Sequence, residues 1–343
     1  MSVTTGTTSR LGLDSTAATS WGRGALTTLL VLAAMAAGTI ASADPLAVAV
    51  AVRGVVMVTP TGGAKAQRAT LGRTLERGDR VQVGAGGAVT LFFSDGNVIE
   101  LGEKSTVTVG GRVGGTDPKT ALAKSAMPTE VFARVSRFVA NDSRSSGLMA
   151  LAPNRGSEKE PAAMLLTPRR TQVLSGRPSF NWRAVEGATR YRLSVSGDQG
   201  EVWNRETNAV TLDYPAVVPE LTGGGEFLCE VRAMSDAGTL LEDDTSFTVL
   251  SADEATHVTS DLDGIVKATA KTSTSAGLYL TASYLVGRGL YSEAIARFQE
   301  LAKLTPDAAG PHEALGNVYR TVGLPELAAA EFQRALELSK TQQ

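Results

Sequence analysis

The chain has 343 residues, of which 20% are charged, and its formal net charge is −2. This length allows two or three domains, and the balance of charges gives no basic excess of the kind that nucleic-acid binding requires. Its single cysteine, Cys229, excludes an intramolecular disulfide and a cysteine-rich metal site. Cys229 alternates with Phe227 and Val231, which predicts a thiol buried in a strand.

The first 43 residues have the features of a secretory signal peptide. Arg10 and Arg23 precede an apolar stretch at 25–37, and Ala41-Ser42-Ala43 follows it. This apolar stretch is shorter than the roughly 20 residues that cross a bilayer. We therefore expect cleavage after Ala43 and export to the periplasm or beyond. The alternative is an uncleaved anchor, the only case in which we expect contact with a membrane.

Residues 46–110 are predicted to form a small antiparallel β-domain. Asp95-Gly96 lies between apolar runs at 89–93 and 98–101, which predicts a hairpin with positive φ at both central residues. Asp79 and Asp95 each adjoin a glycine. We expect both carboxylates to bind local backbone amides, not a metal ion.

The order of motifs in this segment resembles the FecR domain. The matching residues are Gly54-Val55-Val56, Leu71-x-x-x-Leu75-x-x-Gly78-Asp79-x-Val81-x-Val83-Gly84, Ala88-x-x-Leu91-x-Phe93-x-Asp95-Gly96, Leu101 and Ser105-x-Val107. The best-known FecR proteins are inner-membrane regulators that pass an outside signal to a cytoplasmic anti-sigma module. The stretch before residue 25 is too short and too rich in Ser and Thr to resemble that module.

Residues 111–168 are predicted to be a linker that contains a short helix at about 129–140. Thr129 suits the N-cap, and Val131, Val135, Phe138 and Val139 fall on one helical face. We expect this helix to cover an edge of the β-domain. The alternative is an amphipathic helix on a membrane surface.

Residues 169–250 contain short alternating strands that predict a β-sandwich. The run from Pro178 through Trp182, Gly187 and Tyr191 to Val195 resembles fibronectin-type-III-like modules of envelope proteins. Trp182 and Tyr191 lie on the face predicted to point inward. We therefore expect them to be core residues and not a sugar-stacking platform.

The last part of the chain, residues 253–343, contains an internal repeat with a period of 34 residues. Ala282, Gly289, Ala294, Phe298 and Leu301 recur as Gly316, Gly323, Ala328, Phe332 and Ala335. This pattern resembles two tetratricopeptide repeats, at 275–308 and 309–342. A preceding helix at 259–270, with Leu262, Ile265 and Val266 on one face, is expected to cap the first repeat.

Tetratricopeptide repeats generally bind peptides or proteins on their concave surface. The resemblance implies that six residues face a partner: Tyr279, Ser283, Val286, Glu313, Asn317 and Arg320. Asn317 and Arg320 suit a peptide backbone or a carboxylate. An ordinary solvated helix face is the alternative for any one of them.

No catalytic, cofactor-binding or metal-binding motif is present. The two histidines, His257 and His312, do not form a ligand pair, and nucleophile-elbow, P-loop and dinucleotide-binding patterns are missing. The sequence therefore predicts a multidomain, non-enzymatic adaptor or scaffold of the cell envelope that binds protein partners, with a glycan as the other possible ligand. The alternatives are a membrane-anchored FecR-type signalling regulator and a cell-wall or carbohydrate-binding protein.

Overall fold

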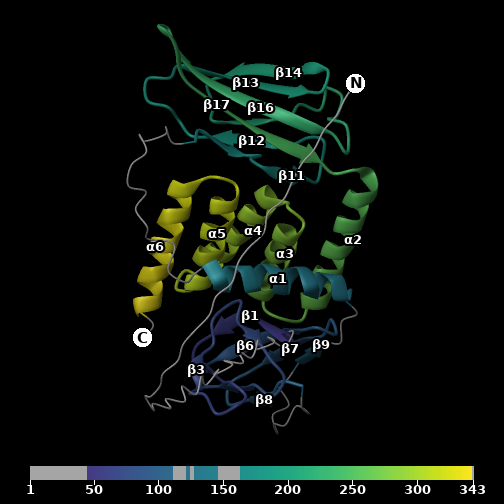
Figure 1. Ribbon diagram of the computed structural model, residues 1–343, viewed down its shortest axis with the longest axis vertical. Helices are drawn as coiled ribbons and strands as arrows, with labels where there is room; N and C mark the ends of the chain where they lie inside the picture. Colours follow the sequence, from purple (N-terminus) through teal and green to yellow (C-terminus); the bar gives the residue numbers. More distant parts are fainter. Residues whose placement is uncertain (1–44, 111–120, 124–126, 146–162, 342–343) are drawn as a thin grey trace, which may run out of the picture. The chain divides into compact units, whose positions relative to one another are not determined.

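The computed structural model describes residues 45–110, 121–123, 127–145 and 163–341. The expected signal peptide, residues 1–43, lies outside these residues, so its cleavage stays a prediction. Within the described residues, every helix is too short or too polar to cross a bilayer. The chain folds into antiparallel β-sheet regions followed by an all-α region of five helices (Figure 1).

The first β-region consists of a five-stranded sheet, in the order β4-β1-β6-β7-β9, and a four-stranded sheet, in the order β3-β2-β5-β8. Their strands are β1 (Ala47–Arg53), β2 (Val56–Thr59), β3 (Gln67–Arg68), β4 (Thr74–Leu75), β5 (Arg80–Val83), β6 (Ala88–Phe93), β7 (Val98–Leu101), β8 (Thr106–Thr108) and β9 (Ala121–Ala123). Strand β9 pairs with β7. The region therefore extends beyond the predicted boundary at residue 110. The predicted boundary is too early because the glycine-rich sequence from residue 110 separates β9 from the other strands.

The two aspartates of this region have structural roles, as predicted. Asp79 accepts hydrogen bonds from the backbone N–H groups of Thr61 and Glu76, each at 3.0 Å. Asp95 accepts one from the backbone N–H of Asn97, also at 3.0 Å. The predicted turn geometry is wrong at Asp95, because only Gly96 has a positive φ, of 83°. The backbone bond from Phe93 N to Asn97 O closes a three-residue loop instead of a two-residue turn.

Helix α1 (Thr129–Ser145) follows the first β-region and is longer than the predicted 129–140. It packs on this region, as expected, but over the middle strand β6 and not over an edge: the rings of Phe132 and Phe92 are 5.3 Å apart, edge to face. Val131, Val135 and Val139 are fully buried. Its apolar face is therefore covered by protein, which argues against the alternative of a membrane-surface helix.

The second β-region has a three-stranded sheet, β10-β12-β15, and a five-stranded sheet, β11-β17-β16-β13-β14, around one hydrophobic core. Their strands are β10 (Leu165–Thr167), β11 (Thr171–Val173), β12 (Ser179–Trp182), β13 (Arg190–Gly197), β14 (Gly200–Thr207), β15 (Thr211–Asp213), β16 (Glu226–Ser235) and β17 (Gly238–Val249). The region begins at β10, earlier than the predicted residue 169. Trp182, Tyr191 and Cys229 are buried in its core, as predicted.

The all-α region contains a single helix followed by two helical hairpins. Its helices are α2 (Ala252–Thr269), α3 (Thr274–Gly287), α4 (Tyr291–Leu304), α5 (Ala309–Thr321) and α6 (Pro325–Thr341). Gly289 and Gly323, 34 residues apart, occupy the two hairpin turns with φ of 75° and 79°. Ala294 and Ala328 are both buried. The repeat read in the sequence therefore corresponds to two equivalent hairpins.

Helix α2 packs on the first hairpin, as the predicted capping helix should. The Tyr284 hydroxyl donates to Asp261 Oδ2 at 2.6 Å, and Ile265 is fully buried. The helix begins seven residues earlier than expected because Ser251 and Glu254 form a capping box. Val266 is 62% exposed, so the prediction that it faces the repeat is wrong, and Val258 is buried instead.

Candidate partner-binding face

The six residues predicted to meet a partner lie at equivalent places on α3 and α5, which we call the α3–α5 face. Helix α3 carries Tyr279, Ser283 and Val286, and α5 carries Glu313, Asn317 and Arg320. Only Arg320 is exposed, whereas Tyr279 is 2% exposed and Ser283 is 0% exposed. Most of the expected binding surface is therefore covered in this structure.

Helix α1 covers the α3 side of this face. Arg134 of α1 donates from Nη1 to the carbonyl oxygen of Gly287, the last residue of α3, at 3.2 Å. A Cβ atom at position 287 would lie 2.9 Å from Arg134 Cβ, so only glycine allows this approach. Figure 1 shows α1 lying across the hairpin helices, and α1 contacts both α3 and α5.

The turn at Leu71–Gly72, just before β4, covers the opposite end of the face. A Cβ atom at Gly72, which has a φ of 79°, would lie 2.5 Å from the Tyr279 hydroxyl and 3.9 Å from Val139 of α1. A Cβ atom at Gly310, in the first turn of α5, would lie 2.7 Å from Leu71 Cβ. One turn of the first β-region therefore contacts both α3 and α5.

These contacts fix the direction of α1. Arg134 lies at the C-terminal end of α3, and Val139 lies near Tyr279, two turns closer to the α3 N-terminus. Helix α1 thus crosses α3 with Arg134 at the Gly287 end and Val139 toward Tyr279 (Figure 1). Tyr279, Ser283 and Gly287 are four residues apart and share one face of α3.

Aromatic rings anchor α1 to the first hairpin. The rings of Phe138 and Phe298 are 5.8 Å apart, and the Tyr279 ring lies 6.1 Å from Phe298, edge to face. All three residues are buried. This cluster places the aromatic residue of the first repeat against a helix that is not part of the repeat.

The three candidates on α5 are joined to one another. Arg320 donates from Nη2 to Asn317 Oδ1 at 2.8 Å, and Asn317 donates from Nδ2 to the Glu313 carbonyl oxygen at 3.1 Å. The Arg320 guanidinium also lies 6.0 Å from the ring centre of Phe332 on α6. Burial raises the pKa of the Glu313 carboxyl above its ordinary value. This side of the face is polar, and part of it reaches solvent.

Two polar atoms on the α1–α3 contact are buried without a hydrogen-bond partner. They are the hydroxyl oxygen of Ser283 and the Nε atom of Arg134. A buried unpaired polar atom costs stability, because the hydrogen bond it made with water is not replaced. The aromatic side chains of this contact are therefore well packed, whereas two of its polar atoms lack hydrogen bonds.

Sequence reasoning missed α1 as the occupant of this face. The one local signal is Phe132, which widens the apolar surface of α1 beyond the single stripe through Val131, Val135 and Val139. A helix that is apolar on two sides packs between two layers. The glycines at 72, 287 and 310 did not indicate this packing in the sequence, because the side chains that lie against them come from distant segments.

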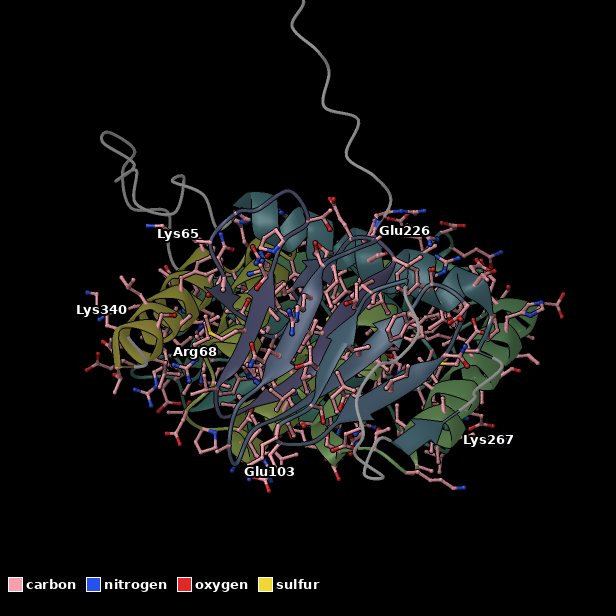
Figure 2. The ribbon with its side chains drawn as sticks, turned by 90° about the horizontal axis from the view of Figure 1, so that it is seen from below. Lys65, Arg68, Glu103, Glu226, Lys267 and Lys340 are labelled. Atoms are coloured by element: carbon pink, nitrogen blue, oxygen red, sulfur yellow. The ribbon has the colours of Figure 1, made fainter. Side chains whose placement is uncertain are left out.

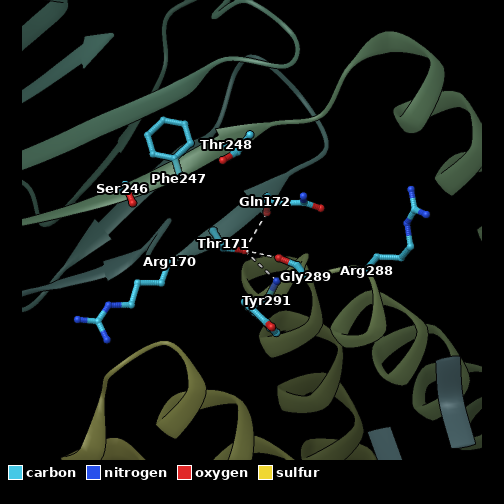
Figure 3. Close-up of a pocket in the computed structure, with 9 residues that line it drawn as sticks. All are labelled: Arg170, Thr171, Gln172, Ser246, Phe247, Thr248, Arg288, Gly289 and Tyr291. Atoms are coloured by element: carbon cyan, nitrogen blue, oxygen red, sulfur yellow. Dashed lines mark hydrogen bonds between the residues drawn. The ribbon is translucent and has the colours of Figure 1, made fainter. Parts of the chain in front are cut away.

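A second concave site lies where β11 meets the turn between α3 and α4 (Figure 3). The Gly289 carbonyl oxygen accepts from Gln172 N at 2.8 Å and from Thr171 Oγ1 at 3.1 Å, and Thr171 Oγ1 accepts from Tyr291 N at 2.9 Å. Figure 3 shows the side chains of Arg170 and Arg288 pointing away from each other. The pocket has a volume of about 270 Å³. Because its polar groups bind one another, we interpret it as a contact between the second β-region and the first hairpin, and not as a ligand site.

The remaining charged groups do not suggest a metal centre. Within the residues that the structure describes, no group of three or more His, Cys, Asp or Glu side chains is placed to hold an ion. Figure 2 shows the labelled side chains of Lys65, Lys267 and Lys340 at the outline of the protein, where they point outward. These lysines are exposed.

Comparisons with known proteins add little. No protein-family profile matches the sequence, and no curated protein matches it. The FN1-FN3 domains of chicken CNTN1 match in structure at 13% identity over 57% of this chain, with a TM-score of 0.18. The match spans about half, 53%, of the length of that structure. At this TM-score the likeness carries no argument about function.

Proposed function

We propose that this chain is a non-enzymatic, exported adaptor of the cell envelope that binds a protein partner through the α3–α5 face. In this proposal the first β-region is a FecR-like domain, the second is a fibronectin-III-like sandwich, and the two hairpins are tetratricopeptide repeats. The FecR-like domain engages a second envelope component, either a protein or a glycan. The signal-peptide pattern supports export.

One observation carries the docking role: the α3–α5 face already binds a helix that does not belong to the repeat. Helix α1 is more than 100 residues away in the sequence, yet it donates to the last carbonyl group of α3 and packs an aromatic ring against Phe298 of α4. Binding an amphipathic helix in a groove is a recurring mode of peptide recognition. The position of α1 therefore supports a face built to receive helices.

The repeat is also joined to the second β-region, as an adaptor with a defined geometry requires. Strand β11 binds the Gly289 turn through one backbone hydrogen bond, from Gln172 N, and two that involve the Thr171 hydroxyl, and Arg183 forms an ion pair with Glu326 of α6 at 2.9 Å. The guanidinium of Arg170 lies against Gly323, the turn glycine of the second hairpin. Both repeat turns thus contact the β11 segment.

Photo-crosslinking in the producing cell tests the proposal. A benzophenone amino acid replaces Arg320, which lies on the solvent-exposed rim of the face, or Arg334, which is exposed on α6, as the matched control. We expect a covalent adduct with an envelope protein from position 320 and not from position 334. Identical adducts from both positions, or none from position 320 and its exposed neighbour Thr321, would refute docking at this face.

A further inference from the structure

We propose that α1 is a built-in competitor for the α3–α5 face, and that the partner binds by presenting an amphipathic helix in place of α1. This inference rests on the proposed docking function and adds the chemistry of the partner. In the closed chain Tyr279 and Ser283 are buried, α1 and strand β1 both pack on α3, and the Leu71–Gly72 turn lies against Tyr279. Release of α1 opens the side of α3 that carries Ser283, whereas the Leu71–Gly72 turn still lies against Tyr279.

The closed contact leaves the polar part of the face unsatisfied. Ser283 is 0% exposed and its hydroxyl has no partner, and Arg134 Nε on α1 is also buried without one. An incoming helix that places a hydrogen-bonding side chain opposite Ser283 would gain a bond that α1 does not supply. This bond would give a partner an advantage of about two- to twelvefold in affinity, which is about 0.5–1.5 kcal/mol, against the high effective concentration of α1 in the same chain.

A cation from α1 lies at the C-terminal end of α3, whose C-cap residue is Arg288. The last turn of α3 contains no basic residue, and its final carbonyl groups carry the negative end of the helix dipole. Arg134, which also forms an ion pair with Glu130, adds positive charge there by donating to Gly287 O. A competing helix with an arginine or lysine at the same place would reproduce this hydrogen bond.

The aromatic cluster defines the other anchor. Phe138, four residues after Arg134, sets its ring against Phe298, and Val135 and Val139 extend the same surface. Residues four apart lie on one face of a helix. The expected ligand is thus an amphipathic helix with a cation and an aromatic residue four positions apart, flanked by β-branched residues.

A labelled peptide of residues 128–145 is the probe for the first test, read by fluorescence anisotropy. Phe138→Ala in the full chain weakens the internal contact, and Arg137→Ala, an exposed change on the same helix, is the matched control. We expect the Phe138→Ala chain to bind the peptide at least tenfold more tightly than the wild-type chain. The Arg137→Ala chain should bind it like wild type. Equal binding by the Phe138→Ala and wild-type chains would overturn the proposal.

A reversible lock provides the second arm. The Cβ position at Gly287 lies 2.9 Å from Arg134 Cβ, so Arg134→Cys with Gly287→Cys forms a disulfide after a shift of about 1 Å toward the usual separation. We expect the oxidised lock to abolish adducts from position 320 and reduction to restore them. Adducts that persist in the oxidised chain would refute competition by α1 while leaving docking itself intact.

Hydrogen exchange on the unmodified chain tests the release of α1 directly, so it does not depend on whether the variants fold. We expect amides of Val135–Val139 to exchange through an opening that leaves Leu315–Tyr319 protected, because release of α1 does not require unfolding of the repeat. If both segments exchange only in the same global unfolding event across a denaturant series, α1 is a fixed part of the core and the proposal is wrong.

Discussion

Gly316 of α5 lies directly against the ring of Phe332 on α6. A Cβ atom at position 316 would sit 2.6 Å from Cε1 of that ring, closer than any side chain can be accommodated without movement. Gly316 is the residue that repeats Ala282 one period later. The second hairpin is therefore packed more tightly than the first at this position.

We predict that Gly316→Ala destabilises the protein by about 1–3 kcal/mol through overpacking. Gly264→Ala in α2 is the matched control, because nothing lies within 4 Å of a Cβ atom there. That change should stabilise the protein by about 0.5–1 kcal/mol, since alanine has a higher helix propensity than glycine in a helix interior. Urea unfolding measures both, and a loss of stability from Gly264→Ala as large as that from Gly316→Ala would contradict the packing argument.

The helical repeat was readable in the sequence because its physics is local. Small residues such as Ala294 and Ala328 recur at a fixed distance from Phe298 and Phe332, and each helical hairpin packs with the next along the chain. The hairpin turns at Gly289 and Gly323 follow from the same period. Both features arise from neighbours within one or two periods.

The closure of the α3–α5 face was not readable in the sequence because it joins distant segments. Arg134 and Gly287 are 153 residues apart, and Leu71 meets Gly310 across a still longer separation. The sequences of α1 and α3 indicate which face of each helix is apolar. They do not indicate that these two faces pack against each other. The exposed concave surface expected from the repeat pattern is therefore largely buried, and partner binding by its residues stays a prediction.

A buried ion pair joins the start of the second β-region to β17. Arg169 Nη1 lies 3.2 Å from Asp243 Oδ2, which also accepts a hydrogen bond from Leu165 N at 2.7 Å. We predict that Asp243→Asn costs about 3 kcal/mol, because it leaves the Arg169 charge buried without its counter-ion. Asp244→Asn, at an exposed position on the same strand, should change stability by less than about 0.5 kcal/mol. Comparable effects of the two changes in urea unfolding would show that the pair is unimportant.

Cys229 serves as a natural reporter of the second core. Its side chain is 0% exposed, and burial raises the pKa of the thiol above its ordinary value, so the reactive thiolate is scarce. We predict that a thiol-reactive dye labels the folded chain at least a hundredfold more slowly than the chain in concentrated urea. Rapid labelling of the folded chain would mean that the core around β16 opens readily.

The carboxyl of Glu293, in the first turn of α4, should make stability depend on pH. Its Oε1 accepts from Leu174 N at 3.2 Å, whereas Oε2 is buried without a partner. Burial raises the pKa of this carboxyl above its value in the unfolded chain, so the folded chain holds the proton more tightly. The contribution of Glu293 to stability is therefore fully present below the unfolded pKa and is lost as pH rises through the folded pKa.

Glu293→Gln removes this charge while keeping an oxygen that can accept from Leu174. We predict that it raises the free energy of unfolding at pH 7 relative to wild type, and that the gain shrinks as the pH falls toward 4, where the wild-type carboxyl takes up its proton. Glu300→Gln, on the exposed side of the same helix, is the matched control and should show no such trend. Urea unfolding of the three chains at pH 4 and pH 7 makes the comparison. If Glu293→Gln lost stability at pH 7, the ionised carboxylate would be a favourable partner for the β11 segment, and burial would not dominate its energetics.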